Sequence, residues 1–441
     1  MSTSRLFGVF GCLLLAVSLN GQSTDTTNTR ESEKAGRMRL VRDPDELKRN
    51  AEAIWAARLA QAGHFLSFGV EGSYDSNTLY NQLIVGLWRG GYLSHDIRET
   101  SQAALNGNNR AGSEASINIS YAWGDSLFGN GSLRPRVSVG YHDLTGMRFA
   151  DDLYNLTFFG NAAYEYKTAS LAPSEYEQVR YQTFGFGVEE KRSRSFIQLE
   201  LVNGQSLRAA VIDRADLFTG TDGRFLELSI DGTYQRSDTT DDGIGRSHGL
   251  GGALSAEFNR TMTIRHHSFP LTFGVQDLGF IAWNANSLRL SKDTVIHYEG
   301  MHVADVLDLN GALSGSADLK DTLALNYQRG GFLRALPALF FARMSTSSMN
   351  GLWQYQFRVG YRFVTGYRPL VSLLAHRKLS DRFSASSELS YGGFGALRFG
   401  IGAEATVMHR VKLNLHTPNL IGLISNEVRG KALMLGVEIT W

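Results

Sequence analysis

The feature that most constrains this chain is a repeated alternation of apolar and polar residues with a period of two. In WQYQFRVGYRF (353–363), Trp353, Phe357 and Tyr361 belong to the apolar set, whereas Gln354 and Arg358 belong to the polar set. Side chains of a β-strand point alternately to its two faces, so each such segment predicts a strand with one apolar and one polar face. Further segments of this kind are 114–123, 133–142, 224–234, 248–258, 382–391 and 396–405.

The repetition predicts an all-β chain of roughly 14 to 16 strands. After residues 1–23, the longest run without a polar residue, ALPALFFA (335–342), has eight residues, whereas a membrane-spanning helix needs about 20. A strand of a transmembrane barrel needs only about 9 to 11 residues with alternating faces. Two classes therefore remain, a secreted soluble β-protein and a transmembrane antiparallel β-barrel.

The positions of aromatic residues and prolines favour the barrel. Aromatic residues gather at strand ends, where barrels place their membrane-interface girdles. In a closed barrel every strand interior must donate to a neighbour, so proline is restricted to strand ends. The aromatic residues are Tyr121, Trp123, Tyr141, Tyr391 and Trp441, and the prolines near strand starts are Pro135, Pro270, Pro337 and Pro369.

Three regions follow one another along the chain. Residues 1–23 have the charge, apolar core and small-residue end of a secretory signal peptide, and they contain the single cysteine, Cys12. Residues 24–63 comprise a polar linker and an amphipathic helix at 43–61, with Asp43 as its N-cap and Pro44 in its first turn. The expected outer-membrane barrel occupies 64–441. A chain with this leader is expected to leave the cytoplasm for the bacterial outer membrane.

The last strand has an apolar face that ends on an aromatic residue. This pattern resembles the signal by which the barrel-assembly machinery takes up its substrates. We expect Trp441 to lie in the interfacial girdle, where the last strand closes the barrel against the first. The residues of this proposed assembly signal are Leu433, Leu435, Val437, Ile439 and Trp441.

The polar faces of the strands are expected to line the lumen. They carry charges of both signs, which narrow or fill a lumen when they pair across it. The residues assigned to the lumen are Arg134, Arg136, Gln354, Gln356, Arg358, Arg362, Arg382, Glu388, Arg398, Glu404 and Glu438.

No motif for catalysis, cofactor binding or metal binding is recognised. The chain has neither a G-x-S-x-G nor an H-E-x-x-H motif. HYEGMH (297–302) brings two histidines and a glutamate together, but such spacing is common in solvated loops. We therefore expect no enzyme activity, no cofactor and no metal. The formal net charge of +1 gives no reason to expect a nucleic-acid partner.

Four short segments resemble landmarks of a family of outer-membrane barrels from Bacteroidetes that is labelled a domain of unknown function. They are FADDLYNLTFFGN (149–161), LVNGQSLR (201–208), GVQDLGFIAWN (274–284) and LPALFFARM (336–344). The resemblance implies an outer-membrane barrel and no particular activity. The early Asn-Pro-Ala segment of lipid-transporter-like barrels is not found, which argues against transferring a fatty-acid transport role.

Three function classes are compatible with these observations. The first is a channel-like or transporter-like, porin-like barrel for a small or amphiphilic solute. About 40 residues separate the predicted cleavage site from the first strand, too few for the plug domain of an energy-coupled transporter. The second is a structural or scaffold barrel of a secretion or surface-display machine, and the third is a barrel enzyme that modifies lipid or peptide. We favour the first, with outer-membrane lipid and the barrel-assembly machinery as partners.

Overall fold

The computed structural model describes residues 63–441, with gaps at 91, 125, 222–224, 239–242, 244, 265–266, 299–326, 349–350 and 408–409. The chain divides into two compact units, Met1–Asp43 and Pro44–Trp441, and every described residue belongs to the second. The predicted signal peptide and the predicted helix at 43–61 lie outside the described residues.

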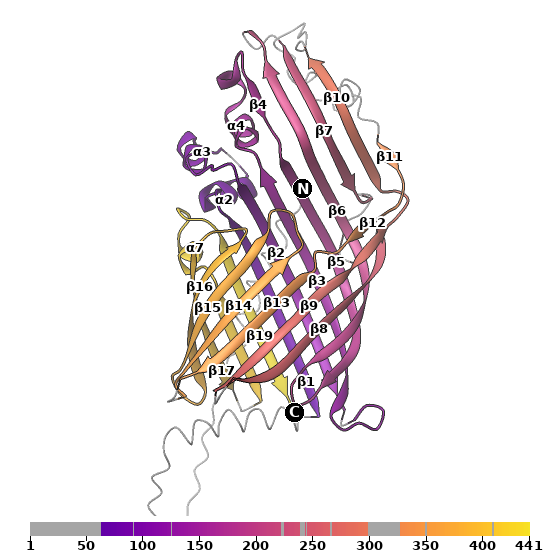
Figure 1. The fold of residues 1–441 in the computed structure, drawn as a ribbon, viewed down its shortest axis with the longest axis vertical. Coiled ribbons are helices and arrows are strands. Elements are labelled where there is room, and N and C mark those ends of the chain that lie inside the picture. The colour runs from indigo at the N-terminus through magenta and orange to yellow at the C-terminus, as the bar shows by residue number, and fades with distance from the viewer. Residues whose placement is uncertain are drawn as a thin grey trace, which may run out of the picture. The chain divides into compact units, whose positions relative to one another are not determined.

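Within the described residues, fourteen antiparallel strands close into a barrel, as the alternation predicted (Figure 1). Each strand pairs with the next, and the last pairs with the first through ten residue pairs from Phe65–Thr440 to Tyr74–Lys431. In order around the barrel they are β1 (His64–Ser76), β2 (Asn109–Trp123), β3 (Leu133–Phe149), β5 (Ser174–Glu190), β6 (Phe196–Thr219), β8 (Gly249–Ile264), β9 (His267–Trp283), β13 (Leu339–Ser347), β14 (Trp353–Arg362), β15 (Arg368–Lys378), β16 (Phe383–Gly393), β17 (Arg398–Val407), β18 (Val411–Thr417) and β19 (Lys431–Thr440).

The two ends of the barrel differ in their connections. At one end, which we call the terminus end, β1 begins, β19 ends and the connecting turns are short. The other end, the loop end, carries the remaining elements. These are α2 (Asn81–Arg89), α3 (His95–Gln102), α4 (Asp151–Phe159), η1 (Ala162–Tyr164), β4 (Thr168–Ser170), β7 (Leu226–Arg236), β10 (Leu288–Tyr298), β11 (Gln328–Arg329), β12 (Phe332–Ala335) and α7 (Leu420–Ile424). Outer-membrane barrels have short periplasmic turns and longer extracellular loops. None of the described helices is long and apolar enough to cross a membrane.

Strand β6 is long enough to belong to two sheets. Its residues Phe196–Gly204 pair with β8 in the barrel, whereas Arg208–Thr219 pair with β7, which in turn pairs with β10. The sheet therefore continues past the barrel at the loop end. The sequence of segment 214–224 predicts a surface loop. In the structure its first part is strand, and Leu217 pairs with Leu228 of β7.

Helices cover the outward face of the first strands at the loop end. Leu83 of α2 and Tyr154 of α4 form a buried cluster with Ala111 of β2, and Met147 of β3 packs against it. Burial raises the pKa of Tyr154 to about 12, so its phenol stays protonated and donates to the carbonyl of Arg98 at 2.9 Å. At the loop end, the outward face of the first strands is thus covered by these helices.

Below the helices, the outward face is an exposed apolar belt. On β2 its exposed apolar side chains are Ile117 and Ile119, whereas Ala111, nearer the loop end of the same face, is buried under the helices. Exposed apolar side chains are found on strands all around the barrel, among them Ile119, Phe186, Leu199, Phe280, Phe357, Leu373, Tyr391 and Phe399.

An aromatic cluster marks the lower edge of the belt at the closing seam. The His64 ring stacks on Trp441 at a centroid distance of 5.4 Å, and Tyr121 stacks on Trp123 at 5.4 Å. The His64 Nδ1 and Tyr121 Oη atoms lie 2.7 Å apart, and the backbone of His64 bonds that of Trp441. The first, second and last strands therefore meet in one aromatic stack.

We predict that Trp441→Ala weakens this seam by about 1 kcal/mol, the size of an aromatic pair beyond its area burial. Deletion of 432–441 should block assembly, because β1 and β18 would keep unpaired backbone in hydrocarbon. The measurement is heat-modifiable migration of the protein in outer-membrane fractions. Trp353→Ala, at the end of an internal hairpin, is the matched control and should assemble normally. Normal migration of the deletion variant would contradict the prediction.

The apolar belt predicts a depth-dependent cost for an added charge. Leu373 lies at the middle of β15 and Leu379 in the following turn, and the two are similarly exposed, 54% and 53%. Leu373→Arg should cost ~2–4 kcal/mol and Leu379→Arg only ~0–1 kcal/mol. Urea unfolding in phospholipid vesicles measures both. Equal costs would show that the belt is not centred on Leu373.

Candidate functional site

The interior of the barrel holds two cavities, which are lined mainly by β13–β19 and β1, while β2, β8 and β9 also contribute to the lining. The loop-side chamber has a volume of about 500 Å³ and the terminus-side chamber about 360 Å³. Along β1, Ser73 and Asp75 line the first and Ser67 lines the second; along β16, Ser390 lines the first and Ser386 the second. The two chambers therefore follow one another along the barrel axis.

Four side chains line both chambers and separate them. Glu71 of β1, Arg358 of β14, His416 of β18 and Met434 of β19 appear in both linings. We call these four residues the collar. His416 Nε2 lies 2.6 Å from Oε2 of Glu388, and Arg358 Nε donates to Gln356 Oε1. Two collar members are thus held by neighbours, and the collar narrows the path between the chambers.

Two turns at the loop end, β14–β15 and β16–β17, form a roof over the loop-side chamber and contact β2. Arg110 of β2 donates to the carbonyls of Gly393 and Gly395, at 3.3 and 2.7 Å. The ring of Phe394 lies so close to Gly112 that a Cβ there would be 2.2 Å from its Cζ, so only glycine allows this approach. The β14–β15 and β16–β17 turns also touch each other, since Tyr367 and Phe394 meet edge to face at 5.1 Å.

The opposite side of the lumen, formed by β3, β5, β6, β8 and β9, is filled. An apolar cluster occupies it, and the large ring of Trp283 packs across Gly204 and Gly249. Gln205 lies in a bulge of β6 and is completely buried. We call this the filled side and the two chambers together the hollow side. The cluster comprises Leu144, Val179, Tyr181, Val202, Leu207, Ala253, Ile281, Trp283 and Leu336, with Phe332 against it.

A buried polar group centred on Asp277 lies beside this cluster. Asp277 has a positive φ of 56° at a bulge where the β8–β9 register shifts. Tyr181 Oη donates to Asp277 Oδ2 at 2.9 Å, and the Asp277 amide donates to Ser255 Oγ at 3.0 Å. His142 stacks on Tyr181 at 4.8 Å. Sequence reasoning missed this group, although the apolar phase shifts between Val275 and Leu278, which is the signal of a bulge.

One ion pair crosses the whole lumen. Arg362 of β14 and Glu114 of β2 lie on strands at opposite points of the closed order, and Arg362 Nη2 bonds Glu114 Oε1 at 2.8 Å. Arg362 is 7% exposed, and its Nη1 donates to the Pro337 carbonyl at 3.3 Å. This pair separates the filled side from the loop-side chamber.

The structure places the proposed lumen residues in several groups. Arg134 and Arg136 bond Glu189 at 2.6 and 2.7 Å on the filled side near the terminus end. Arg358, Arg362, Glu388 and Arg398 line the loop-side chamber, and Glu404 and Glu438 line the terminus-side chamber. Gln356 donates to Ser345 Oγ at 3.1 Å, and Gln354 is exposed.

Arg382 differs from the other proposed lumen residues. It lies in the exposed turn between β15 and β16, because β16 begins one residue later, at Phe383. The residues proposed as the assembly signal lie on β19, where Val437 pairs with Phe68 and Leu435 with Val70 on the first strand.

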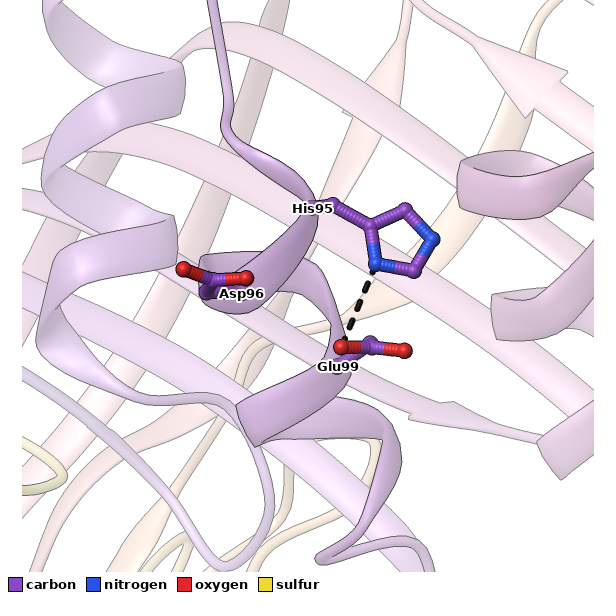
Figure 2. Close-up of side chains that lie close together, drawn as sticks. All are labelled: His95, Asp96 and Glu99. Carbon is purple, nitrogen blue, oxygen red and sulfur yellow. Dashed lines mark ion pairs between the residues drawn. The ribbon is translucent and has the colours of Figure 1, made fainter.

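A group of side chains of the types that bind metals lies on α3, outside the barrel wall. Figure 2 shows that His95 and Glu99 point toward each other, with His95 Nδ1 3.2 Å from Glu99 Oε2, while Asp96 lies on another part of the turn. All three are exposed. We interpret His95 and Glu99 as an ordinary solvent-exposed i,i+4 pair and Asp96 as a separate exposed side chain. The sequence segment HYEGMH lies partly outside the described residues, since Glu299 and His302 are not described.

We predict a large coupling energy between Glu114 and Arg362 in the free energy of unfolding. Glu114→Leu or Arg362→Met alone should cost ~3–5 kcal/mol, because each leaves the other charge buried without its partner, whereas the two together should cost much less. Urea unfolding of both single variants and the double variant measures the coupling. The exposed pair Arg214–Asp293, 3.0 Å apart, is the matched control and should give only ~0–1 kcal/mol. Additive costs at Glu114 and Arg362 would show that the pair is not coupled.

Several solved barrels resemble the chain at low similarity. The translocator domain of the autotransporter NalP from Neisseria meningitidis has a TM-score of 0.30 and 10% identity, covering 90% of this chain and 95% of that chain. The P. putida toluene transporter TodX has a TM-score of 0.38 and 10% identity, covering 88% and 92%. A mutant of the Rh. blastica porin has a TM-score of 0.23 and 9% identity, covering 86% and 99%. These scores are too low to equate individual residues.

Sequence comparison is more specific than these structural likenesses. No curated protein is significantly similar to the chain. A family model described as "Family of unknown function (DUF5723)" matches residues 16–411, which is most of the 441 residues and includes all four landmark segments. The chain therefore belongs to the DUF5723 family.

Proposed function

We propose that the chain spans the bacterial outer membrane and passes a small or amphiphilic solute through its hollow side, without coupling to an energy source. The observation that carries this proposal is the series arrangement of the two chambers, which meet at the collar of Glu71, Arg358, His416 and Met434.

The apolar belt and the aromatic stack support the outer-membrane location. A soluble barrel rarely exposes a continuous apolar band, because such a surface drives association. Here exposed side chains such as Phe186, Leu199 and Leu373 recur around the strands, and every barrel strand has partners on both sides. Closed barrels and helices are the structures that satisfy all backbone groups in lipid.

The path through the hollow side has two constrictions in series. The roof, with Phe394 and Arg110, closes the loop end, and the collar narrows the middle. Flow through constrictions in series stays low while either one remains, so the intact protein should conduct poorly. Transport through this path requires the roof turns to move, which would break the Arg110 bonds to Gly393 and Gly395.

Planar-bilayer conductance of the mature protein tests the proposal. We expect little steady current from the intact protein and little from either Phe394→Ala or Arg358→Ala with Met434→Ala. The combination of roof and collar variants should raise conductance severalfold, because only it removes both constrictions. Leu336→Ala, which truncates a buried side chain on the filled side, is the control and should change nothing.

Two results would contradict the proposal. A large steady current from the intact protein would indicate an open general porin. A combined roof and collar variant that conducts no better than the Leu336→Ala control would remove the hollow side from transport and favour the scaffold function.

A further inference from the structure

The loop-side chamber has an imbalance between hydrogen-bond acceptors and donors. Four of its carboxylates are held by basic side chains. Glu114 bonds Arg362 at 2.8 Å, Glu257 bonds Arg343 at 2.9 Å, Glu388 lies 2.6 Å from His416, and Asp75 bonds Arg398. The fifth carboxylate, Glu71, is in the collar at the floor of the chamber. Most acceptors of this wall are therefore already in use.

Donors on the same wall have no partner among the described residues. Ser390 is 2% exposed and its Oγ bonds nothing, and the Nε atoms of Arg398 and Arg343 are also buried without a partner. All three residues line the loop-side chamber. A buried donor without an acceptor is costly, so a group that supplies acceptors here gains binding energy.

Two of these donors are direct neighbours. Ser390 of β16 and Arg398 of β17 are opposite each other in the register, and opposite side chains on one face have Cβ atoms about 4.5–5.5 Å apart. Two further contacts hold the guanidinium in place, since Arg398 Nη1 bonds Asp75 and Nη2 donates to the Gly392 carbonyl at 3.1 Å. The free Nε and the serine hydroxyl therefore form a fixed pair of donors.

The rest of the chamber is suited to an apolar body. Leu339, Phe341, Leu370, Phe394 and Met434 are also in its lining. The volume of about 500 Å³ is within the range of small-ligand sites, which combine mostly apolar walls with a few placed polar groups. A carboxylate presents two acceptor oxygens, and charge-assisted bonds to them are stronger than neutral ones.

We propose that the loop-side chamber binds a small amphiphilic carboxylate, with its carboxylate at Ser390 Oγ and Arg398 Nε and its apolar body against Phe341 and Leu370. This inference deepens the proposed function, because it names the class of the transported solute. Only the statement that this solute is transported rests on the proposed function. Binding is measurable without transport, so the two can fail separately.

Titration of the full mature protein in a non-ionic detergent with three matched probes, followed by ligand-observed NMR, tests the site. The probes are benzoate, benzyl alcohol and benzylamine, which share the ring and differ in the polar group. We expect saturable binding of benzoate, at least about tenfold tighter than the other two, the factor that a hydrogen bond to a charged group supplies.

Ser390→Ala should weaken benzoate about tenfold and leave benzyl alcohol nearly unchanged. Ser386→Ala is the matched control, since Ser386 lies on the same strand and lines the other chamber, and it should leave benzoate binding unchanged. Equal binding of all three probes, or no saturable binding of benzoate, overturns the proposal and indicates that Ser390 Oγ and Arg398 Nε bind water instead. Equal effects of Ser390→Ala and Ser386→Ala overturn the location. Benzoate binding with no gain of conductance in the roof and collar variants keeps the site and refutes the transport function.

Discussion

The structure depends on the pairing of the last strand with the first. In hydrocarbon an unpaired backbone group costs several kcal/mol, so a sheet of alternating strands has to close on itself. The seam between β1 and β19 pairs ten residues on each strand, and its lower edge is fixed by His64 and Trp441. The width of the lumen follows from the number of strands that this closure encloses.

Fourteen strands enclose more space than their inward side chains can fill evenly. About eight strands give an interior that side chains just fill, so a wider barrel needs a plug, an open channel or a partly filled lumen. Here the filling is one-sided. Arg362 reaches across to Glu114 at 2.8 Å, and the space beyond this pair, on the side of β13–β19, remains as the two chambers.

Three irregularities of the strands build the filled side. Gln205 is bulged on β6, Asp277 is bulged on β9, and Pro337 breaks the line between β12 and β13. Each turns a side chain or a backbone segment inward, and Leu336 beside Pro337 is buried with Trp283. The three positions fall in LVNGQSLR, GVQDLGFIAWN and LPALFFARM. Three of the four segments through which the chain resembles its family thus contain a departure from regular barrel geometry.

Local pattern was enough to predict an all-β barrel and many of its strands, because alternation and turn chemistry are local properties. It could not show that segment 224–234 forms β7, which extends the sheet beyond the barrel. The period of two predicted the strands around Arg358 and Arg362. The partner of Arg362 could not be predicted, because Glu114 is brought opposite to it only by closure of the sheet. The collar residues Glu71 and His416 were missed for the same reason. Arg382 was assigned to the lumen because a strand boundary read from sequence is uncertain by a few residues.

The central claim is that one side of the lumen is filled and the other is hollow. Thiol labelling of purified mature protein tests it, because the only cysteine of the chain, Cys12, lies in the predicted signal peptide. Ser386→Cys places a thiol in the terminus-side chamber, and Thr183→Cys places one on the inward face of β5, at a residue 3% exposed. The account predicts that a small methanethiosulfonate reagent labels the folded protein at position 386 and not at 183, whereas both are labelled in urea. Equal labelling of the two positions in the folded barrel would contradict the account.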